Sequence, residues 1–155
     1  MQHTREEVIQ RAIREFELLD HLVINLTEED WKRPLIRPEG KDPWTVKDAL
    51  AHITYWRAGV VLSARGEKRP SDERGLQYND RNHLIYLRWR DRFPQEVLAW
   101  HRQVHAELLA ALIAAPEKWF NGRVRSADWP ADLDSHSAFH RIKDIEQALA
   151  AKTKE

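Results

Sequence analysis

Apolar residues recur in alternating steps of three and four along the first part of the chain. They follow "TREE", in which Thr4 and Glu7 have the spacing of a capping box. The stripe consists of Ile9, Ala12, Phe16, Leu19, Val23 and Leu26. This spacing places the six side chains on one face of a helix, which is typical of a helix packed in a bundle.

Helix signals recur along the rest of the chain. Thr45 and Asp48 in "TVKD" form a second capping box, and Pro94 suits the first turn of a helix. Pro116 then ends the helix that Pro94 begins. Further helices are therefore expected over about 45–65, 79–91, 94–115 and 134–152.

No stretch alternates apolar and polar residues between hairpin turns, so the sequence predicts no sheet. Proline and glycine mark loops at 32–43, 65–75 and 121–132. A length of 155 residues fits one domain. We expect a single all-α domain over 1–155, a four-helix bundle with one extra short helix.

Composition narrows the choice of partners and sites. Lys and Arg (25) balance Asp and Glu (25), so no overall field attracts nucleic acid or an anionic membrane. No segment has the length and apolarity of a membrane span or a secretion signal, which predicts a cytoplasmic protein. The chain has no cysteine. Any metal site must therefore use His, Asp and Glu.

Two pairs of histidines stand four residues apart, a spacing that brings two imidazoles together on one helical face. His101 and His105 share their face with apolar residues, so we expect them inside the bundle with hydrogen-bond partners. His136 and His140 lie away from the apolar face of the last helix. They could bind one metal ion, or they could be exposed without a role.

His52 borders the apolar stripe of the second long helix, in a series with Trp44, Asp48 and Trp56 at intervals of four. A histidine at the edge of a core usually has a hydrogen-bond partner, and a ligand role is the alternative. Asp48 could orient His52 or act as a base, although its capping role is the simpler explanation. Three other histidines are expected on the surface: His3, His21 and His83.

Arg57 occupies a position at which a bundle helix is usually apolar. The favoured explanation is a side chain whose stem lies along the core and whose head reaches solvent at the end of the bundle. The alternative is an arginine that binds an anion inside a pocket.

Three segments resemble the DinB/YfiT-like superfamily. "DPWTVKDALAHITYW" (42–56) is similar to its signature on the second helix, and "SHSAFHRIKDI" (135–145) to the histidine-containing signature on its last helix. The stretch 75–113, from "GLQYND" to "LLAALI", resembles the ClbS/DfsB branch. The three segments lie between residues 42 and 145, and their order and spacing carry the resemblance.

The resemblance implies an up-down-down-up bundle, often dimeric, that binds a divalent metal. Its ligands would be His52, His136 and His140, and zinc or nickel would suit a set of three imidazoles. The superfamily includes thiol-dependent transferases and isomerases, and ClbS-type proteins that open a strained ring in a genotoxin. We therefore expect a metal-dependent hydrolase or transferase that acts on a small, reactive or toxic molecule, with a small-molecule thiol as a candidate cofactor.

Trp56, Tyr78 and Asn82 are expected to line the mouth of the substrate pocket. One alternative is a non-catalytic protective protein of the ClbS type that sequesters a ligand or DNA. Another is a metal-stabilised scaffold without chemistry. The expected partners are a small-molecule ligand and a second copy of the chain, whereas nucleic acid and membrane are not expected.

Overall fold

The computed structural model describes residues 4–36, 41–121 and 137–151, with the backbone alone at 137–141. Four long helices form the bundle: α1 (Arg5–Val23), α3 (Val46–Arg65), α5 (Pro94–Ala114) and α7 (Ser137–Ala150). The extra helix that the sequence predicts is α4 (Tyr78–Trp89). Shorter turns are α2 (Glu28–Trp31), α6 (Glu117–Phe120) and a 3-10 turn at Ser71–Glu73.

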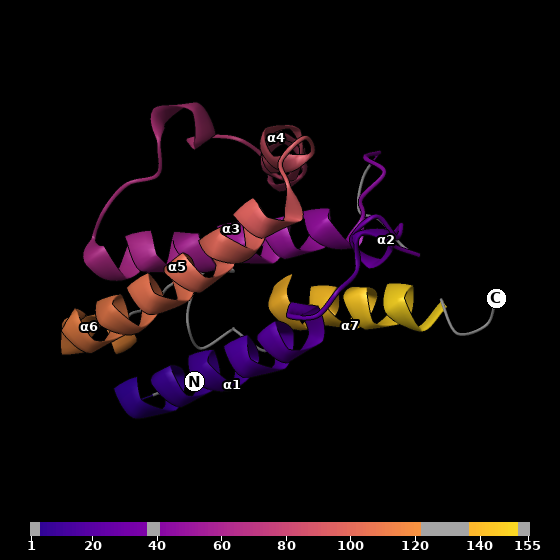
Figure 1. Cartoon of the computed structure of the whole chain (residues 1–155). Helices are drawn as coiled ribbons and strands as arrows, with labels where there is room; N and C mark the ends of the chain where they lie inside the picture. Colours follow the sequence, from indigo (N-terminus) through magenta and orange to yellow (C-terminus); the bar gives the residue numbers. More distant parts are fainter. Residues whose placement is uncertain (1–3, 37–40, 122–136, 152–155) are drawn as a thin grey trace.

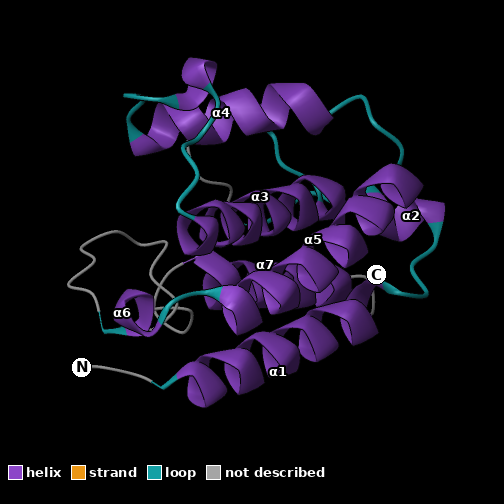
Figure 2. Ribbon diagram, turned by 90° about the vertical axis from the view of Figure 1, so that its left-hand side faces the viewer, coloured by secondary structure: helices purple, strands orange, loops and turns teal. Residues whose placement is uncertain are grey.

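The four long helices have the expected up-down-down-up arrangement. In Figure 1, α1 and α7 run in one direction, while α3 and α5 run in the opposite direction. The helix α4 crosses over α3 and connects it to α5, as Figure 2 shows from the side. The described residues contain no strand, only an isolated bridge between Pro34 and Thr45, which confirms the all-α prediction.

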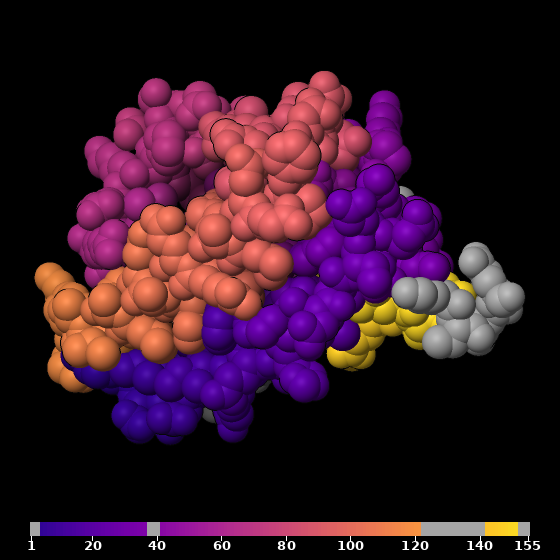
Figure 3. All heavy atoms as spheres, viewed as in Figure 1, coloured from indigo at the N-terminus to yellow at the C-terminus, as the bar shows by residue number. Residues whose placement is uncertain are grey.

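The helix α3 is the centre of the molecule. It packs against α2, α4, α5 and α7, and every residue from Val46 to Arg57 is buried. Its start is the capping box that the sequence predicts, and its end is Gly66, whose φ of 70° is the left-handed conformation that favours glycine. In the space-filling view, α1 and α5 lie side by side over this centre (Figure 3). A helix that is buried on all sides is usually apolar all round, so the polar residues of α3 are exceptions that need an explanation.

Two apolar clusters fill the bundle. In the first, Leu50 and Ile53 of α3 pack with Ile142 and Ile145 of α7. In the second, the other half of α3 packs with α1 and with Leu108 of α5. None of the helices in the described ranges has the length and apolarity needed to cross a membrane.

The buried face of α1 differs from the predicted stripe. It consists of Val8, Ala12, Glu15, Leu19 and Val23. The predicted core residues Ile9 and Phe16 lie beside this face and are only partly buried. A carboxylate, that of Glu15, thus occupies a position on the buried face. The positive charge of Arg57 is its largest favourable charge interaction.

Candidate functional site

His52 lies deep in the first half of α3. Its side chain is 1% exposed and packs between two tryptophans of the predicted series. The ring centroid of Trp44 is 4.8 Å from that of His52, and the centroid of Trp56 is 6.1 Å away in an edge-on arrangement. The position at the edge of the apolar stripe is therefore fully buried in the folded bundle.

The three residues predicted for the pocket are in mutual contact beside His52. Trp56 stacks on Tyr78 with a centroid distance of 5.2 Å, and its Nε1 donates a hydrogen bond to Asn82 Oδ1 over 3.3 Å. Tyr78 and Asn82 come from the first turns of α4, whereas Trp56 comes from α3. The crossing of α4 over α3 thus brings Tyr78 and Asn82 onto Trp56, whose ring is also next to His52.

Two arginines extend this group. The guanidinium carbon of Arg69 lies 5.4 Å from the ring centroid of Trp56, and that of Arg81 lies 5.8 Å from it. Arg69 also donates a hydrogen bond to the hydroxyl oxygen of Tyr55, which itself donates to Glu73 Oε1 over 2.5 Å. Arg69 lies in the connection between α3 and α4, and Arg81 lies on α4 without a spacing signal of its own, so sequence reasoning missed both.

The last helix lies against the half of α3 that carries His52. Ile142 and Ile145 of α7 belong to the same apolar cluster as Leu50 and Ile53, which flank His52 in the sequence. His140 lies in the first turn of α7, with its backbone alone described, and His136 lies outside the described residues. Within the described part of the chain, no three His, Cys, Asp or Glu residues form a metal-binding group. Since two of the predicted ligands fall outside that comparison, the three-histidine site stays a prediction.

Asp48 has the capping role that the sequence favours. Its Oδ2 accepts hydrogen bonds from the backbone N–H and the hydroxyl of Thr45, each over 2.9 Å. Burial raises the pKa of Asp48, and the bonds from Thr45 oppose that rise. One oxygen of the carboxylate is therefore committed to the start of α3.

Arg57 does not reach solvent, so the favoured explanation of its position is wrong. The residue is 4% exposed, and its Nη2 donates to the carbonyl oxygen of Ala12 over 3.2 Å. The same nitrogen lies 3.3 Å from His105 Nδ1. Burial lowers the pKa of Arg57, and the charge of Glu15 opposes that effect. The arginine sits at the middle of a long helix, too far from the bundle end for its head to emerge.

His101 is buried inside the bundle, as the apolar face that it shares predicts, whereas His105 is only partly buried. The ring of Phe16 stacks on both, at centroid distances of 4.7 Å to His101 and 3.7 Å to His105. His101 Nε2 is 3.3 Å from Asp20 Oδ1, within ion-pair distance but outside hydrogen-bond geometry. Burial, and then the charge of Arg57, lower the pKa of each histidine to about 4. Both rings are therefore neutral at pH 7.

Glu15 completes this buried polar group. Neither carboxylate oxygen has a hydrogen-bond partner among the described residues. Burial raises the pKa of Glu15 to about 7, although Arg57 and Arg11 oppose the rise. A lone carboxylate in an apolar stripe leaves no motif, so only the structure reveals its link to Arg57.

The sequence matches the model of one protein family, described as the mycothiol maleylpyruvate isomerase N-terminal domain, over residues 13–146. That range covers most of the chain. The chain belongs to this family. Its fold is the DinB/YfiT-like fold that the sequence motifs indicate. No curated protein matches the sequence.

Two solved structures share the fold of this chain. One is an uncharacterised protein from Escherichia coli UTI89, with a TM-score of 0.74 and 13% identity, over 99% of this chain and 96% of the other. The second is the colibactin self-resistance protein ClbS in complex with double-stranded DNA, with a TM-score of 0.69 and 17% identity, over 98% and 96%. At these identities the likeness concerns the fold. It confirms the ClbS-like helical bundle.

Proposed function

We propose that this protein is a metal-dependent hydrolase or transferase that acts on a small, reactive molecule. The supporting observation is that α7, whose first turn contains His140, packs on the half of α3 that contains His52. His136 precedes His140 by one helical turn. The three histidines would come from two adjacent helices, with the side of α7 that carries the pair turned toward His52.

The residues present suit a divalent metal of the zinc type. The donors would be three imidazole nitrogens, which zinc and nickel accept readily. His52 is almost fully buried between tryptophans, and coordination would use the neutral form of its imidazole. When bound, such a metal would polarise a water or a thiolate for attack.

The chain's own residues would hold the organic part of the substrate. Tyr78 is partly exposed and offers a flat apolar surface, while Trp56 beneath it is buried and Asn82 fixes its indole ring by accepting its N–H. Arg69 and Arg81 add positive charge over the same ring. Substrate binding would thus be assigned to the junction of α3 and α4, with His52 beneath it.

A small-molecule thiol is proposed as the cosubstrate. The family description names mycothiol, and this chain contains no cysteine that could supply a thiol of its own. We also propose a homodimer, as the superfamily resemblance implies. Light scattering coupled to gel filtration measures the oligomeric state directly.

Metal analysis of protein purified without an affinity tag or chelator tests the proposal. We expect about one zinc or nickel ion per chain in the unmodified protein. The variants His52→Ala, His136→Ala and His140→Ala should each lose the ion. His101→Ala is the matched control, because it removes a buried histidine from another part of the bundle. Retention of metal by all three ligand variants would contradict the proposal.

DNA binding is a second candidate, because the similar ClbS structure contains double-stranded DNA. The arginine-rich segment 87–92 offers limited support, since its arginines already contact carboxylates. Arg88 lies 2.6 Å from Asp72, Arg90 contacts Asp91 and Arg92 contacts Glu96. Fluorescence anisotropy of a labelled duplex at several salt concentrations would decide, since phosphate contacts weaken as salt rises.

A further inference from the structure

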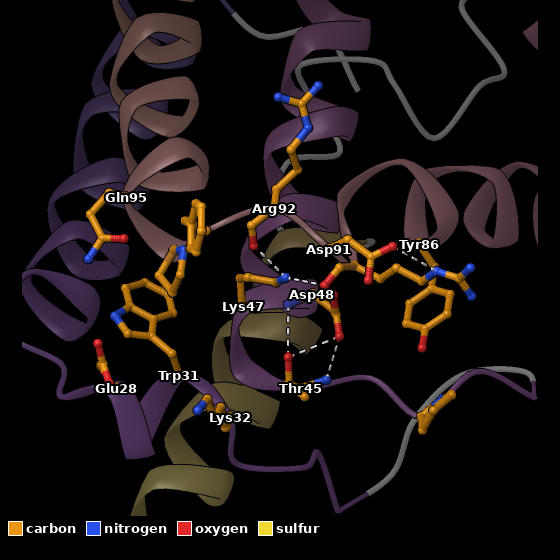
Figure 4. A pocket seen from close by; sticks show the side chains of 14 residues that line it. Glu28, Trp31, Lys32, Thr45, Lys47, Asp48, Tyr86, Asp91, Arg92 and Gln95 are labelled. Carbon is orange, nitrogen blue, oxygen red and sulfur yellow. Dashed lines mark hydrogen bonds and ion pairs between the residues drawn. The ribbon is translucent and has the colours of Figure 1, made fainter.

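A cavity of about 480 Å³ opens beside the start of α3. Its walls come from α2, the first turn of α3, Tyr86 of α4 and the connection between α4 and α5 (Figure 4). The volume lies within the range of small-molecule sites. None of His52, Trp56, Tyr78 and Asn82 lines it, so it is separate from the site proposed above.

Two buried charged side chains line this cavity. Lys47 is 8% exposed, and Asp48 is 7% exposed. The ammonium of Lys47 donates to the carbonyl oxygens of Arg90 and Arg92, over 2.5 Å and 2.7 Å. These two bonds use two of the three protons that a lysine ammonium carries. One N–H of Lys47 therefore remains for a further acceptor.

Asp48 has the complementary capacity. Its Oδ2 is engaged by Thr45, whereas Oδ1 is buried and has no hydrogen-bond partner among the described residues. A buried carboxylate oxygen without a donor is unfavourable, so such a group in a native protein calls for a partner. The cavity is thus lined by a lysine with one unused donor and by a neighbouring carboxylate with one buried, unsatisfied oxygen.

The charge around the cavity is nearly balanced. Four cationic side chains (Lys32, Lys47, Arg90 and Arg92) and three carboxylates (Glu28, Asp48 and Asp91) line it. The three carboxylates would repel a polyphosphate, and the four cations would repel a polyamine. A ligand with one positive and one negative group fits this balance better.

An aromatic surface completes the walls. Trp31 of α2 is 5% exposed, whereas the ring of Phe93 at the start of α5 is 71% exposed. Figure 4 shows Trp31 on the side of the pocket away from Tyr86, with Lys47 and Asp48 between them. Both rings line the cavity, and the exposed phenyl ring offers an apolar surface to a ligand side chain.

We propose that this cavity binds a free amino acid with an aromatic or large aliphatic side chain. The ammonium of the ligand would pair with the carboxylate of Asp48, and its carboxylate would accept a hydrogen bond from Lys47 Nζ. The side chain would lie against Trp31 and Phe93. This site needs no metal and stands or falls independently of the three-histidine proposal.

Ligand-observed NMR with each of the twenty proteinogenic amino acids, followed by calorimetry of the tightest binder, tests the proposal on the unmodified protein. We expect saturable 1:1 binding within the apolar class, with L-phenylalanine as the reference probe. N-acetyl-L-phenylalanine lacks the ammonium and L-phenylalaninamide lacks the carboxylate. Each should bind at least about tenfold more weakly than L-phenylalanine. Equal binding of all three compounds would overturn the proposal, as would no saturable binding of any amino acid at about 10 mM.

A variant pair gives the second measurement. Asp48→Asn keeps an amide oxygen for the capping contact with Thr45 but removes the charge, so amino acid affinity should fall about tenfold. Asp30→Asn changes the equivalent residue of the capping box on α2, which does not line the cavity, and should leave affinity unchanged. Equal affinities for the two variants would contradict the assignment of the ammonium to Asp48.

Discussion

The guanidinium of Arg57 on α3 donates a hydrogen bond across the bundle to the main-chain oxygen of Ala12 on α1, over 3.2 Å. Only 4% of Arg57 is exposed, so this bond joins the two helices through a charged group in the core. Glu15, one turn further along α1, is the carboxylate whose charge opposes the fall in the pKa of Arg57. The core of the bundle therefore contains this pair of oppositely charged residues as well as the apolar clusters.

Replacement of Glu15 by Gln should raise the free energy of unfolding at pH 8. Burial raises the pKa of Glu15 to about 7, from 4.5 for an unburied glutamate. The folded state therefore favours the protonated form. The stability that this preference adds is complete below pH 4.5 and is lost as the pH rises through about 7. Glutamine does not ionise. The free energy of unfolding of the variant, relative to that of the unmodified protein, should therefore be about 2–3 kcal/mol higher at pH 8 than at pH 4.5.

Urea unfolding at the two pH values measures this gain. Glu17→Gln is the matched control, because Glu17 lies on the exposed side of the same helix. A Glu15→Gln variant that loses the same stability at both pH values would show that the carboxylate is charged and favourably paired throughout.

Replacement of His101 by Gln should make stability less sensitive to acid. Burial and the charge of Arg57 lower the pKa of His101 to about 4, so the folded state favours the neutral ring. The stability from this preference is present above pH 6.5 and is lost as the pH falls toward about 4. Between pH 7 and pH 5 the unmodified protein should lose about 2 kcal/mol more than the variant.

Denaturant unfolding at pH 7 and pH 5 gives the two differences. His21→Gln serves as the control, because His21 is exposed on α1. If both variants show the same dependence on pH as the unmodified protein, His101 is not held neutral by its surroundings.

Leu19→Ala should destabilise the bundle more than Phe16→Ala. Leu19 is 1% exposed within the main apolar cluster, and such a truncation costs about 2–5 kcal/mol. Phe16 is only partly buried and contacts His105 and His101 through its ring faces, so its loss should cost about 1–3 kcal/mol. Thermal and urea unfolding of the two variants at pH 7 compare them directly. The reverse order would mean that the ring of Phe16 contributes more to the core than its partial burial indicates.

Helix starts were predictable because they depend on local chemistry. Thr4 with Glu7, and Thr45 with Asp48, form the capping boxes that their spacing indicates. The arrangement of the helices followed from the resemblance of motifs on α3 and α7. The buried position of Glu15 was not predictable in this way, because apolar periodicity assigns a carboxylate to the surface unless its partner is known. That partner, Arg57, is 42 residues away in sequence and meets α1 only in the folded bundle.

The candidate site was predictable in part. The contacts of Trp56 with Tyr78 and Asn82 follow from the crossing of α4 over α3. Arg69, which lies over Trp56, comes from the connection between α3 and α4. No periodic pattern in a loop shows where its side chains will lie, so this residue emerged from the structure alone.

A crystal structure of the protein loaded with zinc measures the geometry on which the proposed function depends. We predict one ion with a nitrogen of His52, of His136 and of His140 each about 2.0–2.1 Å from it. His101 and His105 should remain beside Phe16 without contact to the ion. A structure in which the imidazole of His52 lies more than about 8 Å from those of His136 and His140 would exceed any coordination span and would contradict the metal-dependent function.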